Sequence, residues 1–362
     1  MRVKPTAVLS SAVHFREKSL QVPVDLTSRL KVGTTALWLP PFGQGTGPLG
    51  NLFETLSEAT AQDVLEAAWS AGVRYYDTAP WYGRGLSELR LGAFLRSKPR
   101  DAFLLTTKVG RTLKRPDKLE IFDRAPWIGG LSFDVVIDYS YDGIMRSYEQ
   151  ALQRLGIPTV DGLIIHDLDR GFHGDAVDTH ARALLGSGVK ALEELRRSGD
   201  VRAVGMVFNL SEALDAFIDK IELDCALVAH PYTLLDQASL RSGMARCLAR
   251  NVSVIVGAPY ASGILATGAR PRATYAYSAA PPEILRKVAA IEAVCGAHNV
   301  SLPAAALQFP LAHPAVVSVI AGAVRASEAS ANAAHVQQPI PAAFWSDLKS
   351  ERLIDPESPT PG

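Results

Sequence analysis

The sequence has few of the features that mark a membrane protein, a disulfide-rich secreted domain or a nucleic-acid-binding protein. It contains only three cysteines, an odd number without the spacing of a metal site, so we predict buried reduced thiols in a cytoplasmic protein. No apolar run approaches the ~20 residues that a membrane-spanning helix needs. Lysine and arginine total 37 and aspartate and glutamate also total 37, a balance that does not favour a nucleic-acid partner.

The composition is that of a chain with one large hydrophobic core. Of its 362 residues, 48% are hydrophobic and 20% are charged, which suits a single α/β barrel with insertions. We interpret residues 1–28 as an extension outside the barrel, because their short apolar stretch is interrupted by Arg16–Lys18 and does not form a signal peptide. Residues 29–350 then form a single barrel domain, and residues 351–362 form a C-terminal tail. Both a monomer and a homo-oligomer are compatible with this composition.

Strand-like and helix-like segments alternate along the whole chain. Strict alternation implies a parallel sheet, and eight such units close into a (β/α)8 TIM barrel. The predicted strands cover residues 40–47, 73–77, 102–108, 161–167, 201–207, 225–229, 252–256 and 316–320. Three long connections, residues 111–141, 168–188 and 261–282, follow the third, fourth and seventh strands, and connections of this length usually have a functional role.

Four chemically active side chains stand where the second, third and fourth predicted strands end. Asp77 ends the second strand and Tyr82 follows it, Lys108 ends the third strand, and His166 ends the fourth. In a parallel barrel these positions face the same C-terminal mouth, which is where such barrels build their sites. We therefore expect these four residues to form one catalytic group.

The four side chains together suit proton transfer. A tyrosine has a reference pKa of ~10, and an adjacent ammonium such as that of Lys108 lowers it by stabilising the phenolate. Asp77 would keep Lys108 charged and in place, while a neutral His166 would orient the substrate oxygen. Tyr82 is then a general acid for reducing a carbonyl or a general base for oxidising an alcohol. An acid/base group without metal ligands or a nucleophile points to hydride transfer with a nicotinamide cofactor.

These residues lie in motifs that resemble those of the aldo-keto reductases. The resemblance covers residues 29–335 and includes Asp-Thr-Ala-x-x-Tyr-Gly at 77–83, Thr-Lys-Val-Gly at 107–110 and Asp-Gly-Leu-Ile-Ile-His at 161–166. Together the motifs are specific, since they occur in the family's order and on the expected strands. The resemblance implies a catalytic tetrad of Asp77, Tyr82, Lys108 and His166.

The resemblance also implies a set of cofactor contacts. They are Gly45, Thr46, Asp77, Asn209, Tyr260, Gly263, Leu265, Gly322, Arg325, Glu328 and Asn332. In the family an asparagine at the position of Asn209 holds the nicotinamide carboxamide, and an aromatic residue at the position of Tyr260 stacks on the nicotinamide. The companion glutamine of the family would align with Ala229, so that contact is missing or replaced.

The same resemblance favours NAD over NADP, with NADP still possible. NADP-dependent members carry a lysine where Gly322 falls and an arginine where Glu328 falls, and these cations pair with the 2′-phosphate. Glu328 would instead repel a phosphate of up to ~2 negative charges and could accept a hydrogen bond from a free 2′-hydroxyl. Arg325 is the nearby cation that would weaken this preference.

The flanking segments resemble one branch of the family, the NAD-dependent D-threo-aldose 1-dehydrogenases (L-fucose dehydrogenases), to which pyridoxal 4-dehydrogenase also belongs. The segments are 138–142, 166–169, 173–175 and 232–237. The branch oxidises a cyclic hemiacetal to a lactone, so the resemblance implies a small sugar or carbonyl compound as the substrate. The predicted substrate contacts are Trp81, Trp127, His166 and His173.

Other functions remain open at this stage. An NADPH-dependent aldehyde or ketone reductase would use the same tetrad. Lys108 at a strand end could instead form a Schiff base, as in barrel lyases. A reductase-like barrel could also act as a cofactor-sensing subunit. His166, Asp167, Asp169 and His173 lie on one local segment, whereas barrel metal sites draw ligands from several strands, so we predict no metal.

Overall fold

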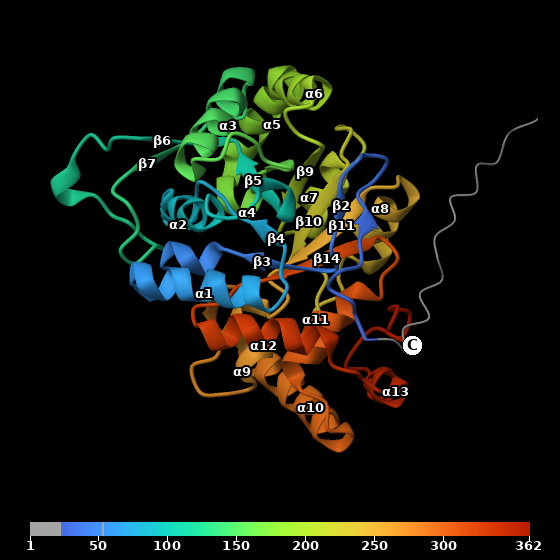
Figure 1. Cartoon of the computed structure of the whole chain (residues 1–362). Coiled ribbons are helices and arrows are strands. Elements are labelled where there is room, and N and C mark those ends of the chain that lie inside the picture. The colour runs from blue at the N-terminus through green and yellow to red at the C-terminus, as the bar shows by residue number, and fades with distance from the viewer. Residues whose placement is uncertain (1–22, 53) are drawn as a thin grey trace, which may run out of the picture.

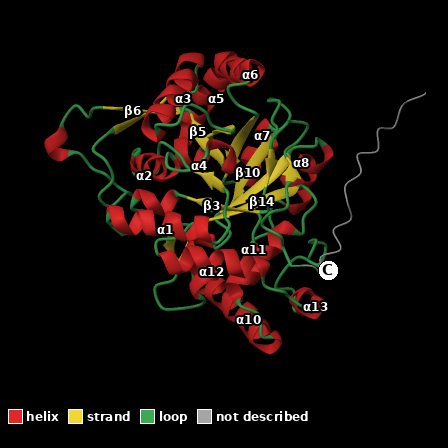
Figure 2. Cartoon of the chain, viewed as in Figure 1, coloured by secondary structure: helices red, strands yellow, loops and turns green. Residues whose placement is uncertain are grey.

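Eight parallel strands form a closed barrel, which confirms the predicted fold (Figures 1 and 2). The computed structural model describes residues 23–52 and 54–362. Each strand pairs with its two neighbours in the ring β3-β4-β5-β8-β9-β10-β11-β14, which follows chain order. The barrel strands are β3 (Phe42–Gly45), β4 (Tyr75–Asp77), β5 (Leu104–Val109), β8 (Gly162–Ile165), β9 (Ala203–Phe208), β10 (Cys225–Ala229), β11 (Ser253–Gly257) and β14 (Val316–Ala321).

Helices surround the barrel, and their ends carry the expected signals. Ser57 caps α1 by accepting a hydrogen bond from Thr60 N, and Gly156 ends α3 in the left-handed conformation. The longer helices are α1 (Glu58–Ser70), α2 (Leu86–Leu95), α3 (Tyr141–Leu155), α6 (Val189–Ser198), α10 (Pro282–His298), α11 (Leu302–Leu311), α12 (Ala326–Gln337) and α13 (Ala342–Ser350). The shorter ones are α4 (Arg170–His173), α5 (Val177–Ala183), α7 (Ser211–Phe217), α8 (Ala245–Ala249) and α9 (Ile264–Thr267).

The three long connections contain more regular structure than the sequence predicts. Residues 111–141 include an antiparallel hairpin of β6 (Arg111–Lys114) and β7 (Asp134–Ile137), which forms an arm projecting from the barrel (Figure 1). Residues 168–188 are mostly helical. The connection after β11 holds a second hairpin, β12 (Thr274–Tyr275) and β13 (Ser278–Ala279). Segments of two to four residues are too short to show a hydrophobic period.

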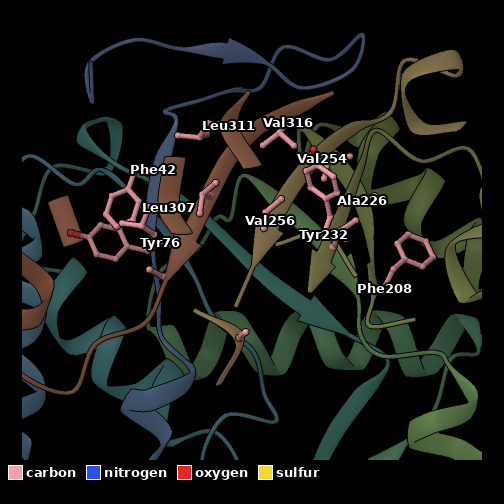
Figure 3. Close-up of a cluster of buried hydrophobic side chains, with 14 of the residues drawn as sticks. Phe42, Tyr76, Phe208, Ala226, Tyr232, Val254, Val256, Leu307, Leu311 and Val316 are labelled. Carbon is pink, nitrogen blue, oxygen red and sulfur yellow. The ribbon is translucent and has the colours of Figure 1, made fainter. Parts of the chain in front are cut away.

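Side chains inside and outside the barrel alternate along each strand, as the period of two requires. Tyr75 and Ile164 belong to an inner cluster that also includes Val32 and Leu39 from a hairpin preceding the barrel. This hairpin consists of β1 (Leu30–Lys31) and β2 (Trp38–Leu39), which pair antiparallel. The larger outer cluster joins the strands to the helices, and Figure 3 shows part of it around Phe42, Tyr76 and Tyr232.

The inward positions change from apolar to polar at the C-terminal ends of the strands. Tyr75 is followed by Asp77 on the same inner face of β4, and Ile164 is followed by His166 beyond β8. At the other end of β8, Asp161 accepts a hydrogen bond from Leu105 N at 2.7 Å and holds the start of the strand. Asp161, at the start of the motif at 161–166, therefore has a structural role, whereas His166, at its end, lies at the barrel mouth.

Most of the predicted N-terminal extension, residues 1–22, lies outside the described residues. In the C-terminal tail, Leu353 and Ile354 are buried in the outer core, and Asp355 pairs with Arg241 at 2.5 Å. All three cysteines are buried and unpaired, as predicted. No helix of the described residues is long and apolar enough to cross a membrane.

Candidate active site

Asp77 and Lys108 form a buried ion pair at the C-terminal ends of β4 and β5. Lys108 Nζ lies 2.5 Å from Asp77 Oδ1 and donates to the carbonyl oxygen of Thr78 at 2.9 Å. The second carboxylate oxygen of Asp77 accepts a hydrogen bond from the hydroxyl of Thr106 at 2.7 Å. Both charged side chains are 1% exposed. The ammonium is thereby held in one position at the barrel mouth.

The loop after β4 places Tyr82 beside this pair. Lys108 Nζ lies 4.8 Å from the centroid of the Tyr82 ring, and the His166 ring stands edge-on to it with centroids 6.0 Å apart. Gly83 follows with a φ of +64°, and a Cβ there would lie 2.6 Å from Gly50 O. Glycine tolerates both the positive φ and this close approach. Gly83 therefore fixes the backbone that directly follows Tyr82 and so helps to place its phenol. The structure thus brings together all four residues of the predicted tetrad.

Burial changes the electrostatics that the sequence led us to expect. Burial raises the pKa of Tyr82 above its ordinary value, and the ammonium of Lys108 only opposes this rise. Lys108 lowers the pKa of Tyr82 as expected, but burial outweighs this effect and the net shift is upward. Burial alone lowers the pKa of Lys108, but the carboxylate of Asp77 and the phenol of Tyr82 raise it overall, so the amine is charged.

His166 is a neutral imidazole. Burial lowers its pKa well below the ordinary value, and the positive charges of Arg111 and Lys108 lower it further. Its Nε2 lies 3.2 Å from Asp167 Oδ2. Its Nδ1 is buried and has no hydrogen-bond partner among residues 23–52 and 54–362. A neutral ring can donate or accept one hydrogen bond at the mouth without adding charge.

The low pKa of His166 predicts that stability decreases in mild acid. The unfolded chain binds a proton at this residue below about pH 6.5 whereas the folded chain does not, so stability increases with pH in this range. We expect His166 to contribute a loss of up to about 1.4 kcal/mol for each pH unit below about 6.5. Urea unfolding of the wild type and His166→Gln over this range measures the effect. An equally steep pH dependence in the variant would contradict it.

Aromatic side chains cover the tetrad on the side of the projecting arm. Trp127, from the arm, contacts Tyr82 with ring centroids 5.8 Å apart and Trp81 with centroids 5.7 Å apart. Arg84 fastens the arm by donating to the carbonyl oxygens of Phe133 at 3.1 Å and of Asp123 at 3.2 Å. The arm therefore forms one wall of the site. Trp127 on this wall and Trp81 beside it are two of the predicted substrate contacts.

His173 lies behind the tetrad and belongs to a hydrogen-bonded chain. Its Nε2 is 3.1 Å from the hydroxyl of Tyr139, which donates to the carbonyl oxygen of His166 at 2.5 Å. Gly110 leaves room for this tyrosine, since a Cβ there would lie 2.3 Å from its ring. In this structure His173 supports the backbone at His166 through Tyr139, which contacts one of its two ring nitrogens.

Comparison with known proteins agrees with this geometry. Residues 41–352 match the model of the aldo/keto reductase family. The chain belongs to this family. It is 39% identical to pyridoxal 4-dehydrogenase of Microbacterium luteolum, covering 89% of this chain and 97% of that protein. It is 38% identical to D-threo-aldose 1-dehydrogenase of a Pseudomonas species, covering 90% of this chain and 96% of that protein.

Solved structures show the same fold at lower identity. An aldo-keto reductase from Bacillus halodurans in its holo form superposes with a TM-score of 0.69 and 23% identity, covering 91% of this chain and 96% of that chain. A glycerol dehydrogenase from Gluconobacter oxydans gives the same TM-score at 19% identity, covering 92% and 97%. The chain is therefore an oxidoreductase of the aldo/keto reductase family, whose members use nicotinamide cofactors.

Most of the predicted cofactor residues gather on one side of the mouth, at the adjacent strands β11, β14 and β3. Tyr260 donates to Asn332 Oδ1 at 2.6 Å, and Asn332 donates to the carbonyl oxygen of Gly322 at 3.2 Å. A Cβ on Gly45 would lie 3.7 Å from Ala321, so glycine here leaves the ends of two neighbouring strands uncovered. This uncovered backbone beside the start of α12 fits a bound nucleotide.

Other predicted cofactor residues already have partners within the protein. The hydroxyl of Thr46 donates to the carbonyl oxygen of Asp77 at 2.9 Å. The amides of Gly263 and Leu265 donate to the carbonyl oxygen of Tyr260 at 2.9 and 3.1 Å. These three residues shape the mouth through internal bonds.

Asn209, the predicted carboxamide contact, is hydrogen-bonded within the protein through its side-chain nitrogen. Its amide donates to Asp167 Oδ1 at 2.8 Å and to Asp169 Oδ2 at 3.1 Å. Asp167 also accepts from Arg111 at 2.8 Å and has a φ of +38°. The buried carboxylates of Asp167 and Asp169 require hydrogen-bond donors, and the side-chain amide of Asn209 donates to both carboxylates. The buried network of Asp167 and Arg111 was missed from the sequence, since nothing in the linear spacing links residue 111 to residue 167.

Proposed function

We propose that the protein is an NAD-dependent dehydrogenase that oxidises the anomeric hydroxyl of an aldose to a lactone. The observation that carries this proposal is the buried Asp77–Lys108 pair beside Tyr82, with a neutral His166 across from the phenol. The arrangement supplies a proton acceptor and an uncharged group for the substrate oxygen. Relatives at 38–39% identity that are named for aldose and pyridoxal dehydrogenation support this class of reaction.

In this mechanism Tyr82 removes the proton from the anomeric hydroxyl. The fixed ammonium of Lys108 stabilises the phenolate form of Tyr82 against the opposing effect of burial, and Asp77 keeps that ammonium charged. Neutral His166 donates or accepts a hydrogen bond at the same oxygen and orients it. Trp127 packs against the ring of Tyr82, with centroids 5.8 Å apart.

The nicotinamide, when bound, takes up the hydride from the carbon that carries the hydroxyl. Gly45, Tyr260, Gly322 and the start of α12 would hold the cofactor on the β11–β14–β3 side of the mouth. The absence of a side chain at Gly45 and the Tyr260–Asn332–Gly322 chain of hydrogen bonds support this placement.

Three features around the first turn of α12 support a preference for NAD. A Cβ on Gly322 would lie 2.5 Å from Pro48, so a lysine is not accommodated at this position. Glu328 accepts a hydrogen bond from Val324 N at 2.8 Å, which keeps its carboxylate at the helix start. Arg325 pairs with Glu54 at 3.1 Å, so its charge is already balanced. A 2′-phosphate would thus meet a net negative environment.

We expect kcat/KM with NAD to exceed kcat/KM with NADP, and Glu328→Arg to shift that ratio toward NADP by about tenfold or more. Glu283→Arg is a matched control, because Glu283 also lies exposed in the first turn of a helix, α10. Both ratios are measured by the absorbance of reduced cofactor at one fixed salt concentration. An NADP preference in the wild type would refute the argument.

The reaction itself is tested by following NADH formation with NAD and a panel of L-fucose, D-arabinose, L-galactose and pyridoxal. Turnover of at least one aldose supports the proposal. Turnover of pyridoxal alone keeps the proton chemistry and changes the substrate, which is the second candidate favoured by the relative of 39% identity. NADPH-driven reduction of simple aldehydes, with no oxidation of the panel, would refute the proposed reaction and keep the family.

The Schiff-base alternative is disfavoured by the state of Lys108. An amine must be neutral to attack a carbonyl, and Schiff-base lysines have a lowered pKa. The partners of Lys108 raise its pKa above the ordinary value. Its Nζ also donates to Asp77 and Thr78, which leaves little freedom to approach a substrate carbon.

A further inference from the structure

Two hydroxyl groups inside the barrel are joined to the Asp77–Lys108 ion pair. Tyr75 and Asp77 lie two residues apart on β4, and Thr106 and Lys108 lie two residues apart on β5, so each pair shares one face of its strand. The two strands are neighbours, with Asp77 opposite Thr106. The phenol of Tyr75 lies 3.0 Å from Thr106 Oγ1, and Thr106 donates to Asp77 Oδ2 at 2.7 Å. The two hydroxyls therefore reach the carboxylate that holds the ammonium.

The chemistry of the carboxylate fixes the direction of these hydrogen bonds. Asp77 pairs with the charged amine of Lys108, and an ionised carboxylate only accepts hydrogen bonds. Thr106 has one hydroxyl hydrogen and gives it to Asp77, so Tyr75 must donate to Thr106. Burial raises the pKa of Tyr75 well above its ordinary value, so the phenol keeps the proton that it donates. The chain therefore runs from Tyr75 through Thr106 to Asp77.

The barrel makes room for this chain at a position where an apolar ring would suffice for packing. A Cβ on Gly43 would lie 2.5 Å from the ring of Tyr75, and a Cβ on Gly162 would lie 3.2 Å from Thr106 Cγ2. Tyr75 is fully buried in the inner cluster, where phenylalanine would fill nearly the same space without a polar atom that needs a partner. The phenol is therefore held where its hydroxyl is used.

The two oxygens of Asp77 are divided between a hydroxyl and the ammonium. In the part of the chain that the structure describes, Thr106 is the side chain that donates to Oδ2, and Lys108 is the one that donates to Oδ1. A hydrogen bond to an ionised oxygen draws off negative charge, and a donor that is itself hydrogen-bonded does so more strongly. The carboxylate then holds the ammonium less tightly, and the ammonium acts more fully on the phenol of Tyr82.

We infer that Tyr75 and Thr106 are positioning residues, which act on the proton transfer through the carboxylate of Asp77. This inference rests on the proposed role of Tyr82 as the proton acceptor or donor. It concerns the proton step and is independent of which substrate the protein converts.

The pH dependence of the reaction reports this effect. Burial raises the pKa of Tyr82, Lys108 lowers it and Asp77 raises it. Without the two hydroxyls the carboxylate binds the ammonium more strongly, so the pKa of Tyr82 rises further. In oxidation activity increases as Tyr82 loses its proton, and in reduction activity decreases, so the inflection moves to higher pH in both directions. The other titratable groups that interact with Tyr82 or Tyr75 are unchanged in the variants below: Asp167, His166, Tyr277, Cys225 and Asp161.

The test is the pH profile of kcat/KM, at the inflection that Tyr82→Phe abolishes. Thr106→Val removes the donor to Asp77 and keeps the branched shape, and it should move this inflection upward by about 0.5 pH unit or more. Tyr75→Phe should move it in the same direction by a smaller amount, because Thr106 still donates. Thr106→Ser keeps the hydroxyl and should restore the profile of the wild type.

Matched controls make the same chemical changes on the other face of each strand. Thr107 is the neighbour of Thr106 on β5, and its hydroxyl donates to Glu88 Oε1 at 2.9 Å, away from the ion pair. Tyr76 is the corresponding control for Tyr75, since its hydroxyl donates to the carbonyl oxygen of Val73. Thr107→Val and Tyr76→Phe should leave the inflection in place, whatever stability they lose in urea unfolding.

A uniform loss of kcat/KM at every pH in Thr106→Val, or an equal shift of the inflection in Thr107→Val, would overturn the inference. If Thr106→Val does not fold, Tyr75→Phe decides, because it leaves the donor to Asp77 in place, and an unshifted inflection in that variant would overturn the inference. If the wild type oxidises no member of the panel, the proposed function fails. The pH profile of NADPH-driven aldehyde reduction then decides the role of the two hydroxyls.

Discussion

Replacing Tyr82 by phenylalanine is expected to reduce kcat for the oxidation by about a hundred- to ten-thousand-fold, the contribution typical of a positioned general acid or base. The variant removes one oxygen atom and keeps the ring that packs against Trp127 and stands edge-on to His166. The fold and the binding of cofactor should therefore be preserved. The measurement is kcat with saturating substrate and NAD, together with the Kd of the cofactor.

The matched control is Tyr76→Phe. Tyr76 lies on β4 beside Asp77 but belongs to the outer core, where its hydroxyl donates to the carbonyl oxygen of Val73 at 3.3 Å. It undergoes the same chemical change without approaching the site. Comparable loss of kcat in both variants would mean that the decrease reflects packing, and substantial activity in Tyr82→Phe would remove Tyr82 from the proposed proton transfer.

Replacing Lys108 by methionine is expected to cost both stability and activity. Asp77 would remain buried without its cation, and breaking a buried ion pair on one side typically lowers the free energy of unfolding by about 3–5 kcal/mol. Activity should fall as well, because the phenolate of Tyr82 loses the positive charge beside it. Urea unfolding measures the first effect, and kcat as a function of pH measures the second.

The double variant Asp77→Asn with Lys108→Met distinguishes the two effects. It removes both charges, so most of the lost stability should return, while Tyr82 still lacks its ammonium and kcat should stay low. Recovery of kcat along with stability would show that Lys108 acts only as a structural partner. Equal instability of the single and double variants would show that the unpaired carboxylate is not the source of the cost.

The fold could be predicted from the sequence because it depends on a local strand–helix pattern that is repeated eight times. Each predicted strand overlaps an observed barrel strand, and signals such as Ser57 and Gly156 mark helix ends in the structure. Periodic burial and capping act over a few residues, so they can be read along the chain. The hairpins β6–β7 and β12–β13 were not predicted, because β12 and β13 have only two residues each and the four-residue strands β6 and β7 pair across residues 115–133.

For the site, the sequence by itself determined the barrel class and the strand ends at which Asp77, Lys108 and His166 face one another. Only the tertiary structure decided how these groups are solvated and paired. Burial, which depends on the whole core, raises the pKa of Tyr82 despite Lys108. Asn209 pairs with Asp167, and Tyr277 meets His230 across 47 residues of chain, since contacts between distant segments depend on where the closed barrel brings them.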